Sequence, residues 1–464
     1  MKGLIILLIY GAIMLVTTLL FTKKEKTAEG FLAGGHNVGL GISALSIATT
    51  WIWAPALFSS AENAYTKGVP GLFWFLVPNV LCLFLFIPFA KKIRRSMPYG
   101  ITLSGYMHDK YESNKVKNVY RFELGTLSVL STAVQLLAGG KMLSLMTGLP
   151  LIATTLILSV IAFSYSQFSG IKGSIVTDAV QMIFLLVASV GISIFAFSKT
   201  GGISTLIDGL GGASGDKTSL FSDSGIEIFL GFGLPTAIGL LSGPFGDQSF
   251  WQRAFAVKKD KIGKAFGIGA VLFGIVPLAM GLLGYMGAGT GMNISDTGMV
   301  NLEVIKSFLP EWVLIPFLFM IISGLLSTVD SNLCSFASLV HNEEKEFSLT
   351  KSKLSMVVLL ALAILIANIP GLTVTHLFLM YGTFRASTML TTVMTLKGIK
   401  LSANGVTYGI IVALVLGMPI FAYGNIAGVT LAKTIGSLVT LLTSGVAAFI
   451  ITKVERKVKC RTTK

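Results

Sequence analysis

Long apolar segments alternate with short polar connections along the whole chain. About 20 consecutive apolar residues are enough to cross a bilayer as a helix. The predicted spans are about 3–21, 38–65, 70–90, 120–146, 149–166, 173–197, 226–250, 264–290, 311–339, 354–370, 375–396, 404–423 and 430–451. The pattern therefore predicts an all-α membrane protein with 13 transmembrane helices in a single membrane domain that covers residues 1–464.

The composition supports this class and excludes others. Only 12% of the 464 residues are charged, about half the fraction typical of a soluble domain. The three cysteines are scattered, so a disulfide framework is not expected. The sequence contains no nucleotide-binding loop, no Ser-His-Asp constellation and no Cys/His cluster. We therefore expect a protein that is not an enzyme.

The basic residues are distributed unevenly between the two sets of loops. Of 36 Lys and Arg residues, 28 lie in alternate loops and in the tail 452–464, whereas 5 lie in the opposite loops. Cytoplasmic loops carry such an excess. We therefore predict a cell-membrane protein with its N-terminus outside and a basic cytoplasmic tail. Topology explains the net charge of +15, so no nucleic-acid partner is expected.

Two predicted spans are interrupted by proline and glycine. The second carries Pro55 after a run of hydroxyl residues, and the seventh carries Ser242-Gly243-Pro244. The seventh span follows the second by five positions in the series, and interruptions paired at such a repeat distance indicate an inverted-repeat transporter. The alternative is two ordinary kinked helices. Interrupted helices leave carbonyl groups unpaired, and these oxygens suit a hard cation such as sodium.

The ninth span supplies hydroxyl groups. Gly324, Ser327, Thr328 and Ser331 recur at three- and four-residue spacing, so they share one helix face. Asp330 lies beside that face, and a carboxylate within a membrane indicates function. The alternative is a Ser/Thr packing face. Asp178 is a second acidic candidate, or a helix cap near the cytoplasm.

Several motifs, taken in order, resemble one known family. They are Phe31-Leu-Ala-Gly-Gly35, Val176-Thr177-Asp178, Asp247-Gln248, Trp251-Gln252-Arg253 and Ser327-Thr328-Val-Asp330-Ser331. Together they resemble the sodium–solute symporters. The resemblance implies a LeuT-like core of two inverted five-helix repeats, 38–197 and 226–396. One peripheral helix, 3–21, would precede this core and two more, within 404–451, would follow it.

The resemblance also implies sodium as the coupling ion. The main site would use the carbonyls of Thr49, Ile52 and Gly324 and the hydroxyls of Ser327 and Thr328. A second sodium site would use Asp178, Ser327, Asp330 and Ser331.

The urea-transporter branch is the most similar, through Thr50-Trp51-Ile-Trp53-Ala54 and Gly382-Thr-Phe-Arg385. Trp51 stands where the proline branch has an aspartate. We therefore expect a small planar uncharged solute. The candidate contacts are Trp51, Trp53, Trp74, Gln135, Ser242, Gly243, Gln248, Tyr381 and Arg385. The alternatives are that the aromatic rings only pack and that Arg385 pairs with a buried carboxylate such as Glu62.

The sequence thus predicts a sodium-coupled symporter that imports a small polar solute by alternating access, with urea or a similar amide favoured. An amino acid or organic acid such as proline, pantothenate or sialic acid is the alternative solute. A proton-coupled carrier, a channel or a membrane sensor is the alternative class. The expected partners are the solute, sodium ions and the lipid bilayer, with the monomer as the functional unit.

Overall fold

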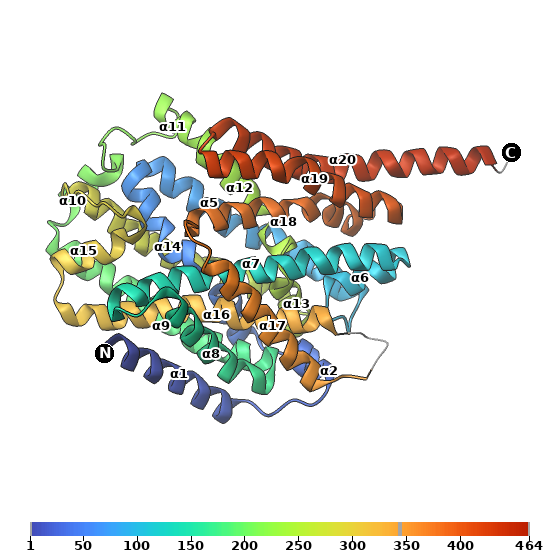
Figure 1. Ribbon diagram of the computed structural model, residues 1–464, viewed down its shortest axis with the longest axis horizontal. Helices are drawn as coiled ribbons and strands as arrows, with labels where there is room; N and C mark the ends of the chain where they lie inside the picture. The colour runs from blue at the N-terminus through green and yellow to red at the C-terminus, as the bar shows by residue number, and fades with distance from the viewer. Residues whose placement is uncertain (1, 342–345, 463–464) are drawn as a thin grey trace.

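The computed structural model describes residues 2–341 and 346–462. These residues are almost entirely helical, and the only β-type pairing among them is an isolated bridge between Val38 and Val257. Figure 1 shows the long helices running side by side as one bundle. The predicted all-α class is confirmed.

The long helices follow the predicted spans. They are α1 (Lys2–Phe21), α3 (Leu40–Trp51) with α4 (Ala54–Leu57), α5 (Ser59–Ser96), α7 (Asn114–Thr147), α8 (Leu151–Ser169), α9 (Ile171–Lys199), α11 (Asp223–Ile228) with α12 (Leu234–Leu241) and α13 (Gln248–Ala256), α14 (Ile262–Gly289), α16 (Leu314–Val340), α17 (Leu349–Ala367), α18 (Val374–Leu396), α19 (Ala403–Ala427) and α20 (Thr430–Thr462). Shorter helices connect them: α2 (Ala28–Ala33), α6 (Leu103–Tyr111), α10 (Ile203–Asp208) and α15 (Val300–Phe308).

In the described part of the chain, 11 helices are long and apolar enough to cross a membrane. Two further predicted spans are α18, which is rich in threonine, and the interrupted helix that begins with α3. This arrangement is consistent with the predicted 13. Large apolar side chains such as Leu20, Val187 and Leu365 are exposed on the outer faces of the bundle, as expected for surfaces that contact lipid.

A kink at Gly68 joins the second and third predicted spans into α5. Gly68 has φ +58° and ψ −147°, a conformation that residues with a side chain avoid. A Cβ atom there would lie 2.3 Å from the carbonyl oxygen of Lys217. Glycine therefore allows the kink and the close contact with the segment around Lys217, which follows α10.

Both predicted interruptions are present. The first separates α3 from α4 at Ile52 and Trp53, which are extended, and Pro55 lies in the first turn of α4. The second separates α12 from α13 and contains Pro244 in a short 3-10 turn. Proline lacks the N–H group that a continuous helix requires, so each helix ends close to its proline.

The helices α3 and α16 lie at the centre of the bundle, and both pack against α9. At the periphery, α1 packs on α8, and the α19–α20 pair packs on α18. Figure 1 shows α20 continuing beyond the other helices toward the C-terminus. The described part of the predicted tail 452–464 is therefore a helical extension of the last span.

Candidate functional site

Five buried oxygen atoms converge where the end of α3 meets the middle of α16. The hydroxyl of Ser327 lies 3.2 Å from the carbonyl oxygen of Thr49 and 3.1 Å from that of Gly324. The hydroxyl of Thr328 lies 3.3 Å from the carbonyl oxygens of both Ile52 and Gly324. The structure thus brings together all the residues that the resemblance implied for the main sodium site.

The local backbone explains why these oxygens are available. Thr49 and Ile52 stand at the C-terminal end of α3, where carbonyl groups carry partial negative charge. The carbonyl of Thr49 accepts one hydrogen bond, from the N–H of Ile52 at 2.9 Å, and a carbonyl oxygen has a second lone pair for a further partner. Gly324 lets α16 approach this end, because a Cβ atom there would lie 2.7 Å from Leu57 and 3.2 Å from Ile52. The cluster contains carbonyl and hydroxyl oxygens and no carboxylate, which suits a hard monovalent cation.

A second polar centre is organised by Arg253 on α13. Its Nη2 atom donates to Asp178 Oδ2 at 2.7 Å and to the hydroxyl of Ser331 at 2.8 Å. The hydroxyl of Ser46 also donates to Asp178 Oδ2, at 2.6 Å. Both side chains of this ion pair are buried. Removing two charges from water costs desolvation free energy, which their mutual attraction and hydrogen bonds must offset.

Asp330 completes this centre. Ser174 donates to its Oδ1 atom at 2.8 Å, and Thr177 donates to its Oδ2 atom at 3.2 Å. Arg253 bonds to Asp178 and is a charged neighbour of Asp330, and Asp178 Oδ1 has no hydrogen-bond partner among the described residues. Asp178, Asp330 and Ser331 of the predicted second site therefore lie together, and Arg253 already contacts Asp178 and Ser331. Ser327, the fourth candidate, bonds within the five-oxygen cluster instead.

The burial of Arg253 corrects the sequence analysis. We counted it with the cytoplasmic loop residues, yet its side chain is 1% exposed. The predicted span ended at 250, whereas α13 continues to Ala256. The motif Trp251-Gln252-Arg253 matched the family pattern, but its polar residues have the composition of a loop, so the predicted span ended before it. The excess of basic residues in the cytoplasmic loops remains when Arg253 is removed.

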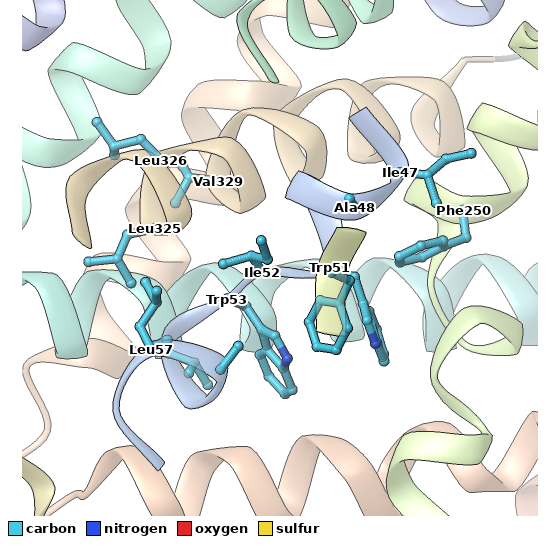
Figure 2. Close-up of a cluster of buried hydrophobic side chains, with 14 of the residues drawn as sticks. Ile47, Ala48, Trp51, Ile52, Trp53, Leu57, Phe250, Leu325, Leu326 and Val329 are labelled. Atoms are coloured by element: carbon cyan, nitrogen blue, oxygen red, sulfur yellow. The ribbon is translucent and has the colours of Figure 1, made fainter. Parts of the chain in front are cut away.

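Aromatic rings fill the space between the two interruptions. Figure 2 shows Trp51 and Trp53 projecting from the end of α3 on one side, while Ile52 points toward Val329 of α16 on the other. The two indole rings are stacked with centroids 6.1 Å apart, and Trp53 is 5.5 Å from the ring of Tyr381. At Gly243 a Cβ atom would lie 2.3 Å from Trp51, so the second interruption contacts the first directly.

Arg385 lies among these rings. Its guanidinium carbon is 5.3 Å from the centroid of Trp51, 5.8 Å from that of Trp53 and 4.6 Å from that of Tyr381. Glu62, the carboxylate suggested as a partner for Arg385, has Lys67 and Asp296 as its charged neighbours. Arg385 is anchored instead by its Nε atom, which donates to the carbonyl of Gly239 at 2.5 Å.

The sequence analysis did not single out Glu123 on α7. Its side chain is fully buried, and Arg385 and Asp247 are its charged neighbours. Thr388 donates to its Oε1 atom at 3.2 Å. Glu123 lies near the start of the predicted span 120–146, beside the polar loop that precedes the span, so the sequence pattern did not distinguish it from a loop residue.

The polar or ring atoms of three other predicted solute contacts, Gln135, Ser242 and Trp74, have partners within the protein. The amide of Gln135 accepts from the N–H of Ala54 at 2.7 Å, so it caps α4. The hydroxyl of Ser242 donates within its own helix, to Ile238. Trp74 packs on Phe229, with ring centroids 4.7 Å apart.

The side-chain amide of Gln248 bonds to other segments of the chain. Its partners include the backbone of Ile101 and Leu103, in the segment that leads into α6. The amide therefore connects α13 to α6 in this structure.

Comparison with known proteins gives consistent matches. A model of the sodium:solute symporter family matches residues 31–413. "Probable urea active transporter 1" of Schizosaccharomyces pombe is 26% identical over 58% of this chain and 42% of its own length. "Urea-proton symporter DUR3" of Oryza sativa subsp. japonica is 23% identical over 62% of this chain and 43% of its own length. The chain thus spans less than half the length of these relatives.

The fold has a solved counterpart. The structure of a substrate-bound, outward-open Na+-coupled sialic acid symporter aligns with a TM-score of 0.79, at 19% identity and over 98% of each chain. This likeness supports the predicted LeuT-like architecture.

Proposed function

Because this chain belongs to the sodium:solute symporter family, we propose that it imports a small polar organic solute together with sodium, by alternating access. The observation that carries this proposal is the five-oxygen cluster between α3 and α16. These helices belong to opposite predicted repeats. An ion that binds both would favour the conformation in which they meet, because a ligand stabilises the state that it binds better.

Sodium entry would supply enough free energy for this transport. A tenfold concentration ratio is worth about 1.4 kcal/mol, and a potential of about 100 mV adds about 2.3 kcal/mol per charge. Together these would support accumulation of the solute on the order of several hundredfold.

We propose urea or a similar small amide as the solute. The stacked rings of Trp51 and Trp53 offer flat apolar faces, and Arg385 offers hydrogen-bond donors beside them. Pockets of this kind bind by shape with a few converging polar groups. The similarity to urea transporters agrees with this assignment. An amino acid or organic acid remains the alternative solute.

The carboxylate centre favours a second coupling ion. When both are ionised, Asp178 and Asp330 place two negative charges against the single positive charge of Arg253. A buried excess charge is costly, so a proton or a second sodium ion would balance it. Proton coupling is therefore the second candidate, and one relative is named a urea-proton symporter.

Uptake by purified protein in liposomes tests the function. We expect labelled urea to accumulate under an inward sodium gradient and not when potassium replaces sodium. A proton gradient imposed without sodium measures the second candidate. Accumulation driven only by protons would contradict sodium coupling, and sodium-driven uptake of proline or sialic acid without urea would contradict the proposed solute. We place the protein in the cell membrane, where the solute enters the cytoplasm.

A further inference from the structure

Four buried hydrogen-bonding atoms on the first interruption, α18 and α7 have no partner among the described residues. They are Nη1 and Nη2 of Arg385, Nε1 of Trp53 and Oε2 of Glu123. Most buried polar groups in proteins are paired, so each exception requires an explanation such as a ligand. Three of these atoms are donors and the fourth is an acceptor.

Neighbouring contacts place the donors and the acceptor around one region. Arg385 lies 5.8 Å from the ring of Trp53. Thr388, one helical turn beyond Arg385 on α18, donates both to Oε1 of Glu123 at 3.2 Å and to the carbonyl of Arg385 at 3.3 Å. Glu123 is thus held on the same side of α18 as Arg385.

These two charged groups do not form an ion pair with each other. The ion pairs found in the described part of the chain, within a 4.0 Å limit, do not include one between Arg385 and Glu123. A purely structural pair would be closed, because leaving opposite buried charges unpaired is costly. The open ends are better explained by a solute that lies between them.

We propose that Glu123 is a solute-binding residue that accepts a hydrogen bond from an N–H group of an amide, while Arg385 and Trp53 donate to the carbonyl oxygen of the same amide. This inference rests on the proposed amide symport. Urea fits the arrangement because it is planar, has one carbonyl and carries N–H groups on the opposite side. A carboxylate would be repelled by Glu123, and a ketone would leave Glu123 unpaired.

A series of competitors tests this assignment without altering the protein. Urea, acetamide and acetone share a trigonal planar shape but have two, one and no NH₂ groups. We expect them to inhibit sodium-driven uptake of labelled urea in that order, with acetone weaker than urea on the order of tenfold to hundredfold. Equal inhibition by all three would overturn the proposed role of Glu123.

The variant Glu123→Met keeps the size of the side chain and removes the acceptor. We expect its half-saturating urea concentration to rise on the order of tenfold or more, and the order among the three competitors to disappear. Tyr120→Phe is the matched control, since Tyr120 lies one turn away on α7 and bonds only to Thr391 and Thr392. The control should retain the urea affinity and the competitor order of the unmodified protein.

The outcomes separate this inference from the proposed function. Urea uptake with unchanged affinity in Glu123→Met would overturn the role of Glu123 and leave urea symport intact. Failure of the unmodified protein to take up either urea or acetamide, while it transports another solute with sodium, would overturn both.

Discussion

At the residue scale, the main sodium site depends on two side-chain hydroxyls and three backbone carbonyls. Backbone carbonyls persist through most substitutions, so the hydroxyls of Ser327 and Thr328 are the ligands that mutation can remove. Their role is therefore open to direct measurement.

We expect Ser327→Ala and Thr328→Ala each to raise the sodium concentration needed for half-maximal uptake, by roughly tenfold, because each removes one oxygen ligand of a buried ion. Sodium titration of solute uptake in liposomes measures this. Ser335→Ala is the control, because Ser335 lies on the same helix and bonds to the carbonyl of Asn332. Unchanged sodium dependence in both variants would refute the site.

A second residue-scale prediction concerns the carboxylate centre. Asp178→Asn removes one of the two negative charges beside Arg253. If a second sodium balances that charge, the sodium Hill coefficient of uptake should fall from near two toward one. A coefficient of one in the unmodified protein, with a single charge moved per solute, would show that no second sodium takes part.

At the element scale, the two interrupted helices could be predicted because their causes are local. Pro55 follows a run of hydroxyl residues and Pro244 follows Gly243, and such combinations favour an interrupted membrane helix. A proline alone is not sufficient, since Pro78 and Pro277 lie inside the continuous helices α5 and α14. The spacing on the ninth span also placed Gly324, Ser327 and Thr328 on one face, as the structure has them. The ion pair of Arg253 and the position of Glu123 could not be predicted, since each depends on contacts between helices that are distant in the sequence.

The prediction at this scale concerns the close approach of α16 to the end of α3. Gly324→Ala would place a methyl group 2.7 Å from Leu57, so α16 would have to move away from the end of α3. We expect a lower sodium affinity, by roughly tenfold or more, although all five oxygen ligands remain. Sodium titration of uptake again measures the change. Gly191→Ala is the control, because a Cβ atom there meets nothing within 4 Å. An unchanged sodium affinity in Gly324→Ala would contradict the proposal that the close approach of α16 to α3 forms the site.

At the scale of the whole molecule, the loop charges give an orientation. The count of 28 basic residues falls by one when the buried Arg253 is excluded, and the asymmetry remains large. The last helix, α20, extends beyond the bundle (Figure 1), so we expect a domain fused after it to be tolerated.

We therefore predict a cytoplasmic C-terminus and an external N-terminus. A reporter enzyme or fluorophore that is active only in the cytoplasm, fused after Lys464, should be active. The control is the same reporter fused before the first residue, which should be inactive. The reverse pattern would contradict the predicted topology.

The contacts of the two hydroxyls have a consequence for the empty carrier. Ser327 and Thr328 donate to the same carbonyls of α3 that would coordinate sodium. After the ion and solute leave, the two repeats would still be joined, but only by neutral hydrogen bonds worth about 1 kcal/mol each. Thermal motion breaks hydrogen bonds of this strength readily. The same contacts that shape the ion site would therefore let the unloaded transporter return and begin another cycle.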